Sequence, residues 1–315
     1  MHIILITPYP LTARNGNAHT ALRWARFLRG AGHRVEVAVE WDGHPADLMI
    51  ALHARRSYAA IAAFATTHPQ RPLIVVLTGT DLYRDIRTDH SAQHALQLAT
   101  RLVVLQTRGL DELTAPLQTK TSVIFQSAPT LATRPKRTRT FDICVVAHLR
   151  DEKDPLRAAY AAALLPAQSR IRVLHVGAAL TPEMALAAEH CRANPRWHWL
   201  DARPHADTRR LIAGCRLLVQ SSRMEGGANT IAEAVSAGVP VLASGISGNI
   251  GMLGEDYSGY YPLADSQALA KLMRRAETDP DFYAELAARC AARAPLFEPR
   301  AERSAVQNLI KEFES

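Results

Sequence analysis

Short, continuously apolar runs recur along the whole of this chain, and stretches with helical spacing lie between them. Apolar runs of about four to eight residues without polar alternation are typical of strands buried on both faces. Such strands alternate with helices in parallel sheets that are covered on both sides, so the sequence predicts an α/β protein with doubly wound parallel sheets. The runs lie at Ile3–Thr7, Val35–Val39, Leu48–Leu52, Leu73–Leu77, Leu102–Leu105 and Val123–Phe125, and then at Asp142–Ala147, Arg172–Val176, Trp197–Leu200, Leu217–Gln220, Val239–Ala243 and Tyr260–Leu263.

A segment rich in Pro, Thr and Arg, near residues 129–140, separates the runs into two sets. A chain of 315 residues is long for one hydrophobic core, so we expect two domains. We place one Rossmann-like domain at 1–133, a second at 134–298 and a terminal helix at 299–315. Two such domains would face a central cleft, with ligands beyond the carboxyl ends of the strands. The basic run Arg134–Arg139 is interpreted as a solvated linker, with nucleic-acid binding as the less favoured alternative.

The segment from Glu225 to Ser244 has the pattern of a glycine turn, a helix and a buried strand. A glycine turn at a helix start leaves backbone N–H groups free for a phosphate and adds the positive end of the helix dipole. Glu225 and Glu233 would lie about 12 Å apart along such a helix, a span that suits a sugar nucleotide. Two glutamates on one helix also fit a solvated face, but the double glycine and the flanking strands favour a site. Gly238 and Pro240 are expected to end the helix. The candidate residues are Glu225, Gly226, Gly227, Ala228, Asn229 and Glu233.

The loop after the first run leads into a helix and carries candidate anion ligands. Gly16 and Asn17 tolerate unusual backbone angles and bring N–H groups close to an anion. A plain turn with Asn17 as the helix cap fits the sequence equally well. Thr20 and Arg23 follow within the expected helix and complete this group of candidates.

Two further loops of the first half follow apolar runs. Arg55 and Arg56 lie at an expected helix start, which is unfavourable to the helix dipole unless they face an anion. Surface placement of the two arginine side chains is the ordinary alternative. His53 directly follows an apolar run and is expected to face the cleft. Thr80 and Asp81 are candidates for hydrogen bonding or proton transfer, and capping of the next helix is an equally consistent role.

The first loop of the second half contains His148, Arg150 and Lys153. It follows a buried run, so the two cations would lie at the ligand edge of the sheet. Cations there would stabilise the negative charge that develops on a departing diphosphate. A plain surface cluster of charges is the alternative interpretation.

The composition narrows the class of protein and of ligand. The net charge of +7 favours acidic ligands, including phosphorylated small molecules. The four cysteines lack metal-binding spacing, and we expect reduced thiols and no metal centre. Asp279 and Asp281 are interpreted as a turn and helix cap rather than as metal ligands. No apolar run approaches the roughly 18 residues of a membrane helix, and no leader pattern is present, so we expect a soluble cytoplasmic protein.

The segment from Glu225 to Val241 resembles the donor motif of family 4 glycosyltransferases, which have the GT-B fold of two facing Rossmann-like domains. The resemblance implies a nucleotide-sugar donor in the second domain, an acceptor in the first and no required metal. It also implies that Glu233 binds the ribose and Glu225 the hexose, that Arg150 and Lys153 bind the diphosphate, and that a helix at 301–314 packs back on the first domain. His148 stands where the family has an arginine, and Thr-Gly-Thr-Asp stands where many members have a histidine.

Longer strings along the chain are similar to those of a narrower group, the selenosugar synthases of selenoneine biosynthesis. This resemblance implies transfer of selenium from selenophosphate to the anomeric carbon of a UDP-sugar, with UDP-N-acetylglucosamine as the expected donor. Enzymes that supply selenophosphate or act later in that pathway are the implied partners. The strings are Ala51–Ser57, Leu77–Ile86, His148–Pro155 and Ser222–Asn229.

Selenophosphate is a small, highly charged anion whose selenium is already a strong nucleophile. It needs positioning and charge neutralisation more than a general base. We therefore assign the candidate acceptor residues to the first half of the chain. Two other functions remain open. One is an ordinary family 4 transferase with a hydroxyl acceptor, and the other is a non-catalytic regulator that binds sugar nucleotides. The candidate acceptor residues are Gly16, Asn17, Thr20, Arg23, His53, Arg55, Arg56, Thr80 and Asp81.

Overall fold

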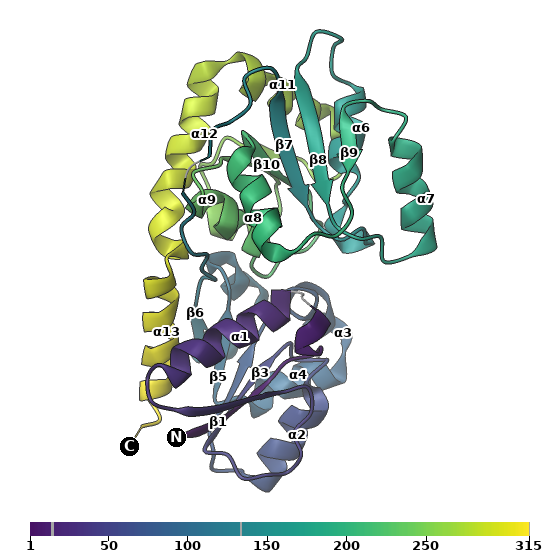
Figure 1. The fold of residues 1–315 in the computed structure, drawn as a ribbon. Helices are drawn as coiled ribbons and strands as arrows, with labels where there is room; N and C mark the ends of the chain where they lie inside the picture. Colours follow the sequence, from purple (N-terminus) through teal and green to yellow (C-terminus); the bar gives the residue numbers. More distant parts are fainter. Residues whose placement is uncertain (14–15, 133, 315) are drawn as a thin grey trace. The chain divides into compact units, whose positions relative to one another are not determined.

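The computed structural model describes residues 1–13, 16–132 and 134–314 (Figure 1). These residues form two compact α/β units, each built on a parallel sheet, as the sequence predicts. Residues 127–132 group with the second unit, whereas the sequence analysis placed them in the first domain. The first unit consists of Met1–Gln126, Glu225–Gly227 and Pro299–Ser315, and the second of Ser127–Met224 and Ala228–Glu298.

A six-stranded parallel sheet organises the described part of the first unit, with the order β2-β1-β3-β4-β5-β6. Strand β1 lies between β2 and β3 and pairs with both. After β1 the chain forms β2 on one side of it and then crosses to the other side to form β3. The direction of progression therefore reverses between β1 and β3, which is where doubly wound sheets bind ligands. The strands are β1 (His2–Ile6), β2 (Arg34–Ala38), β3 (Leu48–Leu52), β4 (Leu73–Val76), β5 (Arg101–Val104) and β6 (Thr121–Val123).

Alternate residues of β1 enter two different cores, one on each face of this sheet. Ile3 and Leu5 belong to one buried cluster, and Ile4 and Ile6 belong to the other. Successive side chains of a strand point to opposite faces, so a strand covered on both sides must be apolar throughout.

Helices cover both faces of the first sheet. Helices α1 and α13 contribute to the cluster that contains Ile3, whereas α2 and α4 contribute to the other cluster. Helix α13 comes from the far end of the chain and lies against α1 (Figure 1). The helices are α1 (Gly16–Arg29), α2 (Tyr58–Thr67), α3 (Ile86–Thr88), α4 (His90–Leu98), α5 (Ala115–Gln118) and α13 (Pro299–Lys311), with a π-helical turn at Asp81–Asp85.

The second unit has its own six-stranded parallel sheet, in the order β12-β11-β10-β7-β8-β9. Here the progression reverses between β7 and β10, which pair directly. This is the strand order of a dinucleotide-binding Rossmann sheet. The strands are β7 (Phe141–Val146), β8 (Ile171–Val176), β9 (Trp197–Trp199), β10 (Leu217–Gln220), β11 (Val241–Ser244) and β12 (Tyr260–Tyr261).

Helix α12 (Pro280–Arg293) of the second unit begins with a local signal that the sequence supplies. Asp279 accepts a hydrogen bond from the N–H of Phe282 at 3.0 Å and caps α12, with Pro280 as the first helical residue. This confirms the interpretation of Asp279 as a cap. The helices are α6 (Arg157–Ala163), α7 (Pro182–Cys191), α8 (His205–Gly214), α9 (Asn229–Ser236), α10 (Ser247–Leu253), α11 (Ser266–Thr278) and α12 (Pro280–Arg293).

Some element boundaries differ from the predicted ones. Helix α1 begins at Gly16, so Asn17 is its second residue and the prediction of Asn17 as the cap is wrong. Strand β11 begins at Val241 rather than Val239, because Gly238, at a φ of +67°, still belongs to the turn that ends α9. That conformation favours glycine and confirms the predicted helix stop.

Candidate active site

Two loops meet at the carboxyl edge of the second sheet, where the strand order reverses. The loop after β7 and the loop after β10 follow adjacent parallel strands. The N–H of Arg223 donates to the carbonyl of Glu152 at 2.8 Å, and the hydroxyl of Ser221 donates to the carbonyl of Lys153 at 3.1 Å. These bonds tie the two loops into one structure at the ligand edge of the sheet.

The loop after β7 carries two cations, Arg150 and Lys153, among three acids, Asp151, Glu152 and Asp154. His148 and Arg150 are exposed, and Lys153 is half-buried at the end of a short 3-10 turn. Partial burial lowers the pKa of His148, and the nearby charges of Arg150 and Lys153 lower it further. Nδ1 of His148 accepts a hydrogen bond from the N–H of Ala178 at 3.1 Å, so a neutral ring carries its proton on Nε2. The loop is therefore a cluster of two cations beside a histidine that resists protonation.

Gly177 holds the next loop against this one, and sequence reasoning missed it. Its φ is +156°, and a Cβ atom there would lie 1.8 Å from the carbonyl oxygen of Ala147. Only glycine permits such an approach of two backbones. The signal available in the sequence was a glycine directly after a buried strand.

Glu233 is buried within α9, with 8% of its surface exposed. Its Oε1 lies 2.5 Å from Nε2 of His205, the first residue of α8. The alternative of a solvated acidic face is therefore wrong for Glu233. His205 is a site neighbour that the sequence did not indicate, because it lies 28 positions away from Glu233.

Glu225 is also buried, with 6% of its surface exposed, but it does not belong to the helix. Helix α9 begins at Asn229, so the 12 Å spacing expected along a continuous helix does not apply. Glu225 groups with the first unit, where burial raises the pKa of Tyr83 and the charges of Glu112 and Glu225 add to that rise. The hydroxyl of Tyr83 accepts a hydrogen bond from Nε2 of Gln106 at 2.8 Å.

The double glycine serves close packing. A Cβ atom on Gly226 would lie 1.6 Å from the carbonyl oxygen of Thr78, and one on Gly227 would lie 2.6 Å from Cβ of Leu105. The N–H of Ala228 donates to the sulfur of Met252 at 3.0 Å. The first N–H groups of α9, beginning with that of Asn229, have no partner within the helix itself.

The carboxyl edge of the first sheet is organised by Asp81. This carboxylate is fully buried and accepts hydrogen bonds from the N–H groups of Ala54, Thr78 and Gly79 at 2.9–3.0 Å. It ties the loop after β3 to the loop after β4. Its oxygens are engaged by backbone donors, so Asp81 has the geometry of a structural anchor rather than of a proton acceptor.

His53 adopts a left-handed backbone, at a φ of +74°, and is buried. Nε2 lies 3.0 Å from the hydroxyl of Thr80, and the N–H of Arg56 donates to Nδ1 at 3.3 Å. A neutral ring therefore donates from Nε2 to Thr80. The Thr80 side chain makes no helix-cap bond, so the capping interpretation of Thr80 is wrong. A non-glycine residue in this conformation costs energy and persists only where its surroundings hold it.

The arginines predicted near the acceptor have different partners. Arg23 donates from Nε to Glu302 at 2.6 Å, which joins α1 to α13. Arg55 lies 3.6 Å from Asp85, whereas the guanidinium of Arg56 lies over the ring of Tyr9 at 4.9 Å from its centroid. Of the three, only Arg56 lies against an aromatic ring rather than a carboxylate.

The remaining candidates of the first unit lie at the start of α1. Gly16 and Asn17 are its first two residues, and the hydroxyl of Thr20 donates to the carbonyl of Gly16 at 2.9 Å. Thr20 also accepts a hydrogen bond from the amide of Gln126. The first bond lies within the first turn of α1, and the second anchors that turn to Gln126.

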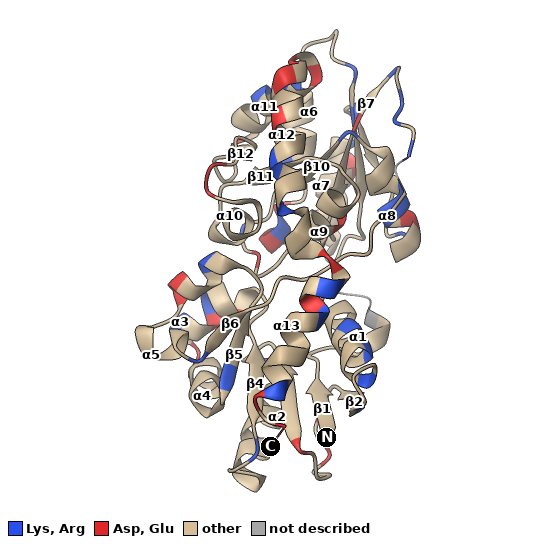
Figure 2. Ribbon diagram, turned by 90° about the vertical axis from the view of Figure 1, so that its left-hand side faces the viewer, with Lys and Arg blue, Asp and Glu red and all other residues tan. Residues whose placement is uncertain are grey.

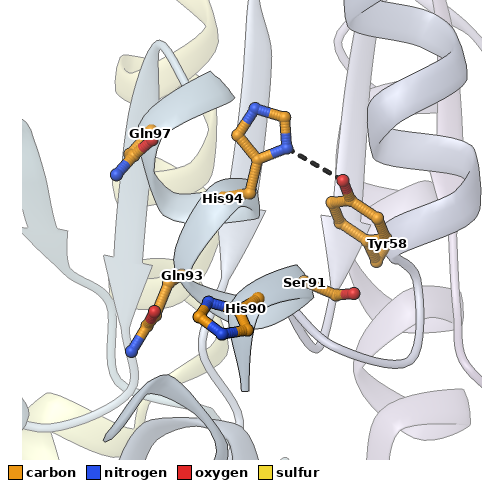
Figure 3. Close-up of a pocket in the computed structure, with 6 residues that line it drawn as sticks. All are labelled: Tyr58, His90, Ser91, Gln93, His94 and Gln97. Carbon is orange, nitrogen blue, oxygen red and sulfur yellow. Dashed lines mark hydrogen bonds between the residues drawn. The ribbon is translucent and has the colours of Figure 1, made fainter. Parts of the chain in front are cut away.

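A hollow of about 370 Å³ lies between α2 and α4, and sequence reasoning missed it (Figure 3). The hydroxyl of Tyr58 lies 2.8 Å from Nδ1 of His94, which fixes that ring. His90 and His94 are four residues apart on α4, and this spacing on one helix face was the available signal. The other lining residues are Ser91, Gln93 and Gln97.

The described residues contain neither a metal-binding cluster nor a membrane-spanning helix. No group of three or more metal-ligating side chains is close enough to hold a metal ion within residues 1–13, 16–132 and 134–314. In the same part of the chain, no helix is long and apolar enough to cross a membrane.

Comparisons with known proteins concern the family and the fold of this chain. Residues 131–296 match the profile of the family described as glycosyl transferases group 1. Glycosyltransferase 1 domain-containing protein 1 of Xenopus tropicalis is 24% identical over 307 residues, which cover 86% of this chain and 87% of that protein.

The structural comparisons concern the fold alone. HepE of Anabaena, solved in complex with UDP, superimposes with a TM-score of 0.78 at 17% identity, covering 99% of each chain. Sucrose-phosphate synthase of Thermosynechococcus elongatus superimposes with a TM-score of 0.80 at 14% identity, covering 100% of this chain and 99% of that one. These neighbours are GT-B glycosyltransferases, and the predicted fold class is confirmed.

Proposed function

Because this chain belongs to the glycosyl transferases group 1 family, we propose that it is a UDP-sugar-dependent transferase whose acceptor is selenophosphate. In the proposed step, the bond from the anomeric carbon to the diphosphate oxygen breaks and its electron pair leaves with UDP. A selenium lone pair forms the new carbon–selenium bond. Hydrolysis of the phosphorus–selenium bond then releases phosphate and leaves the selenosugar.

The observation that supports binding of the donor is the pair Arg150 and Lys153 in the loop after β7, which is hydrogen-bonded to the loop after β10 where the strand order reverses. Arg150 and Lys153 would neutralise the diphosphate and stabilise the charge that develops on UDP. Since these cations supply the positive charge, we propose that transfer needs no metal. HepE was solved with UDP-glucose bound, which supports a UDP-sugar as the donor for a chain of this fold.

The proposed roles of the two buried glutamates follow from their chemistry. A carboxylate accepts hydrogen bonds from neighbouring hydroxyl groups, and a buried one does so in a medium of low dielectric. Glu233 would accept from the ribose hydroxyls, and Glu225 from the hexose.

The assignment of selenophosphate as the acceptor is supported by the segments that resemble selenosugar synthases. It is also supported by the absence of a competent base among the described candidates of the first unit. Asp81 is engaged by backbone N–H groups, and a neutral His53 donates toward Thr80. Selenophosphate needs no base, because its selenium is already nucleophilic. The first N–H groups of α1 and the guanidinium of Arg56 are the groups proposed to hold its phosphate.

The test is incubation of the purified protein with UDP-N-acetylglucosamine and selenophosphate under anaerobic conditions, in the presence of EDTA, followed by mass spectrometry. The expected products are UDP and a selenium-containing hexosamine. Parallel reactions replace selenophosphate by glycerol or inorganic phosphate. UDP release with an alcohol and none with selenophosphate would overturn the acceptor assignment. UDP-sugar binding without any turnover would contradict the proposed transferase activity.

Two variants separate the roles within the site. Glu225→Gln is expected to slow transfer more than it weakens UDP binding, because its charge is proposed to act on the hexose. Lys153→Ala is expected to weaken both. Unchanged UDP affinity in Lys153→Ala would remove this residue from the diphosphate site.

A further inference from the structure

A second cavity, of about 600 Å³, lies in the second unit at the opposite end of its sheet from the candidate site. Its strand residues are Asp142, the second residue of β7, and Arg172 and Leu174, the second and fourth residues of β8. His148 follows the other end of β7, which is about 20 Å away along the strand. The cavity is therefore separate from the loops proposed to bind the UDP-sugar.

Positive charge dominates the lining of this cavity. Four arginines line it together with one acid, Asp142. Arg172 donates to both oxygens of Asp142 at 3.0 and 2.7 Å, and Arg210 donates to Asp207 at 2.8 Å, so Arg134 and Arg137 supply the excess positive charge of the lining. Figure 2 shows basic residues on the segment that enters β7 and on α8. The arginines are Arg134, Arg137, Arg172 and Arg210.

Two ionisable groups next to the cavity have a lowered pKa, and burial is the main cause in both. The charge of Arg216 adds to the shift of Lys136. The charge of Arg172 adds to the shift of His198, and Asp142 opposes it.

Part of the lining is apolar. Leu174 and Leu211 are half-buried, and Cys215 is buried. A simple inorganic anion would leave these side chains uncovered. Arginines together with apolar side chains fit a ligand that combines a phosphate with an apolar or planar body, and the volume is within the range of small-molecule sites.

We propose that this cavity is a second ligand site, which binds an organic phosphate of about mononucleotide size outside the transfer site. The segment that precedes β7 is then part of a binding site, where the sequence favoured a solvated linker. The proposal is independent of the transferase function, since no residue of the cavity belongs to the candidate active site.

The experiment measures binding of AMP to the full chain by isothermal titration calorimetry, with inorganic phosphate as a second probe. The double variant Arg134→Gln/Arg137→Gln is compared with Lys271→Gln/Arg289→Gln, which removes the same charge from exposed positions on α11 and α12. We expect AMP to bind the cavity variant about tenfold more weakly than the unchanged protein. The control variant should keep its affinity, and phosphate alone should bind more weakly than AMP.

Three results would overturn the proposal. Equal losses in the two double variants would show a general charge effect, and unchanged binding in the cavity variant would place AMP elsewhere. If the protein bound vesicles that contain phosphatidic acid but did not bind AMP, the cavity would be a site for lipid headgroups instead. Lys153→Ala should leave the arginine-dependent binding intact, which separates this outcome from failure of the transferase proposal.

Discussion

Nε2 of His205 lies 2.5 Å from Oε1 of Glu233, and this contact joins the start of α8 to the buried acid of α9. The contact fixes the orientation of the Glu233 carboxylate on α9, a short helix of 8 residues. A carboxylate that is buried and held in place is prepared to accept hydrogen bonds from a ligand, because little further ordering is needed when the ligand arrives.

Glu233→Gln is expected to weaken UDP binding about tenfold or more, because a hydrogen bond to a charged acceptor is worth roughly 1.5–3 kcal/mol. The loss should concern the ribose, so the variant should no longer discriminate between UDP and its 2′,3′-dideoxy analogue. Calorimetric titration of both nucleotides measures this. Glu183→Gln, on α7, is the matched control, and discrimination that survives in Glu233→Gln would contradict the ribose role.

Glu302→Ala is expected to destabilise the first unit by about 3 kcal/mol, because it breaks a buried ion pair. Glu302 is 1% exposed and accepts hydrogen bonds from Nε of Arg23 at 2.6 Å and from Nε1 of Trp24 at 2.8 Å. Denaturant unfolding followed by circular dichroism measures the change. Glu312→Ala removes an exposed pair with Arg101 and should cost less than about 1 kcal/mol. Similar losses in the two variants would argue against this view of Glu302.

Gly177→Ala is expected to cost about 3 kcal/mol and to reduce transfer activity, because the added Cβ would press on the carbonyl of Ala147 and the φ of +156° is strained for alanine. Chemical denaturation and a steady-state assay measure the two effects. At Gly245 a Cβ would lie 3.5 Å from the carbonyl of Tyr261, an ordinary contact, so Gly245→Ala should stay within about 1 kcal/mol. An unaffected Gly177→Ala would show that the loop has room to move.

Stability is expected to fall as the pH is lowered from about 6.5 to about 4. Burial lowers the pKa of His175 to about 4, so in this window the unfolded chain binds a proton that the folded chain excludes. Stability therefore rises with pH across the window and has its full value above it, and the difference amounts to about 3 kcal/mol.

His175→Gln tests this assignment, because an amide still donates to the carbonyl of Ala147, which Nε2 of His175 reaches at 3.0 Å, but does not titrate. Urea unfolding at several pH values should show a shallower pH dependence in this variant than in His190→Gln, a control at the exposed end of α7. Equal slopes in the two variants would mean that other groups govern the acid sensitivity.

The strands were predictable because their signal is local. A strand buried on both faces must be apolar throughout, so β1, β3 and β10 are visible in the sequence wherever they fold. Helix ends follow equally local rules, as the cap at Asp279 and the stop at Gly238 show. Boundaries were less secure where a turn and a strand share residues, as they do before β11.

Side-chain partners could not be predicted from the sequence, because they depend on which surfaces the folded chain brings together. Arg23 has the charge expected of a residue that binds an anion, yet it pairs with Glu302, a residue 279 positions away. Asp81 has the chemistry of a proton acceptor, yet three backbone N–H groups engage it.

The sequence by itself determined the alternation of strands and helices and the parallel sheets, because backbone hydrogen bonding and two-sided burial leave a periodic pattern in the residues themselves. It indicated the family through the resemblance of the segment from Glu225 to Val241 to a known donor motif. Only the tertiary structure decided that Glu225 lies outside α9, that His205 holds Glu233 and that arginines of the linker line a cavity. These outcomes depend on contacts between distant segments, and no local pattern records them.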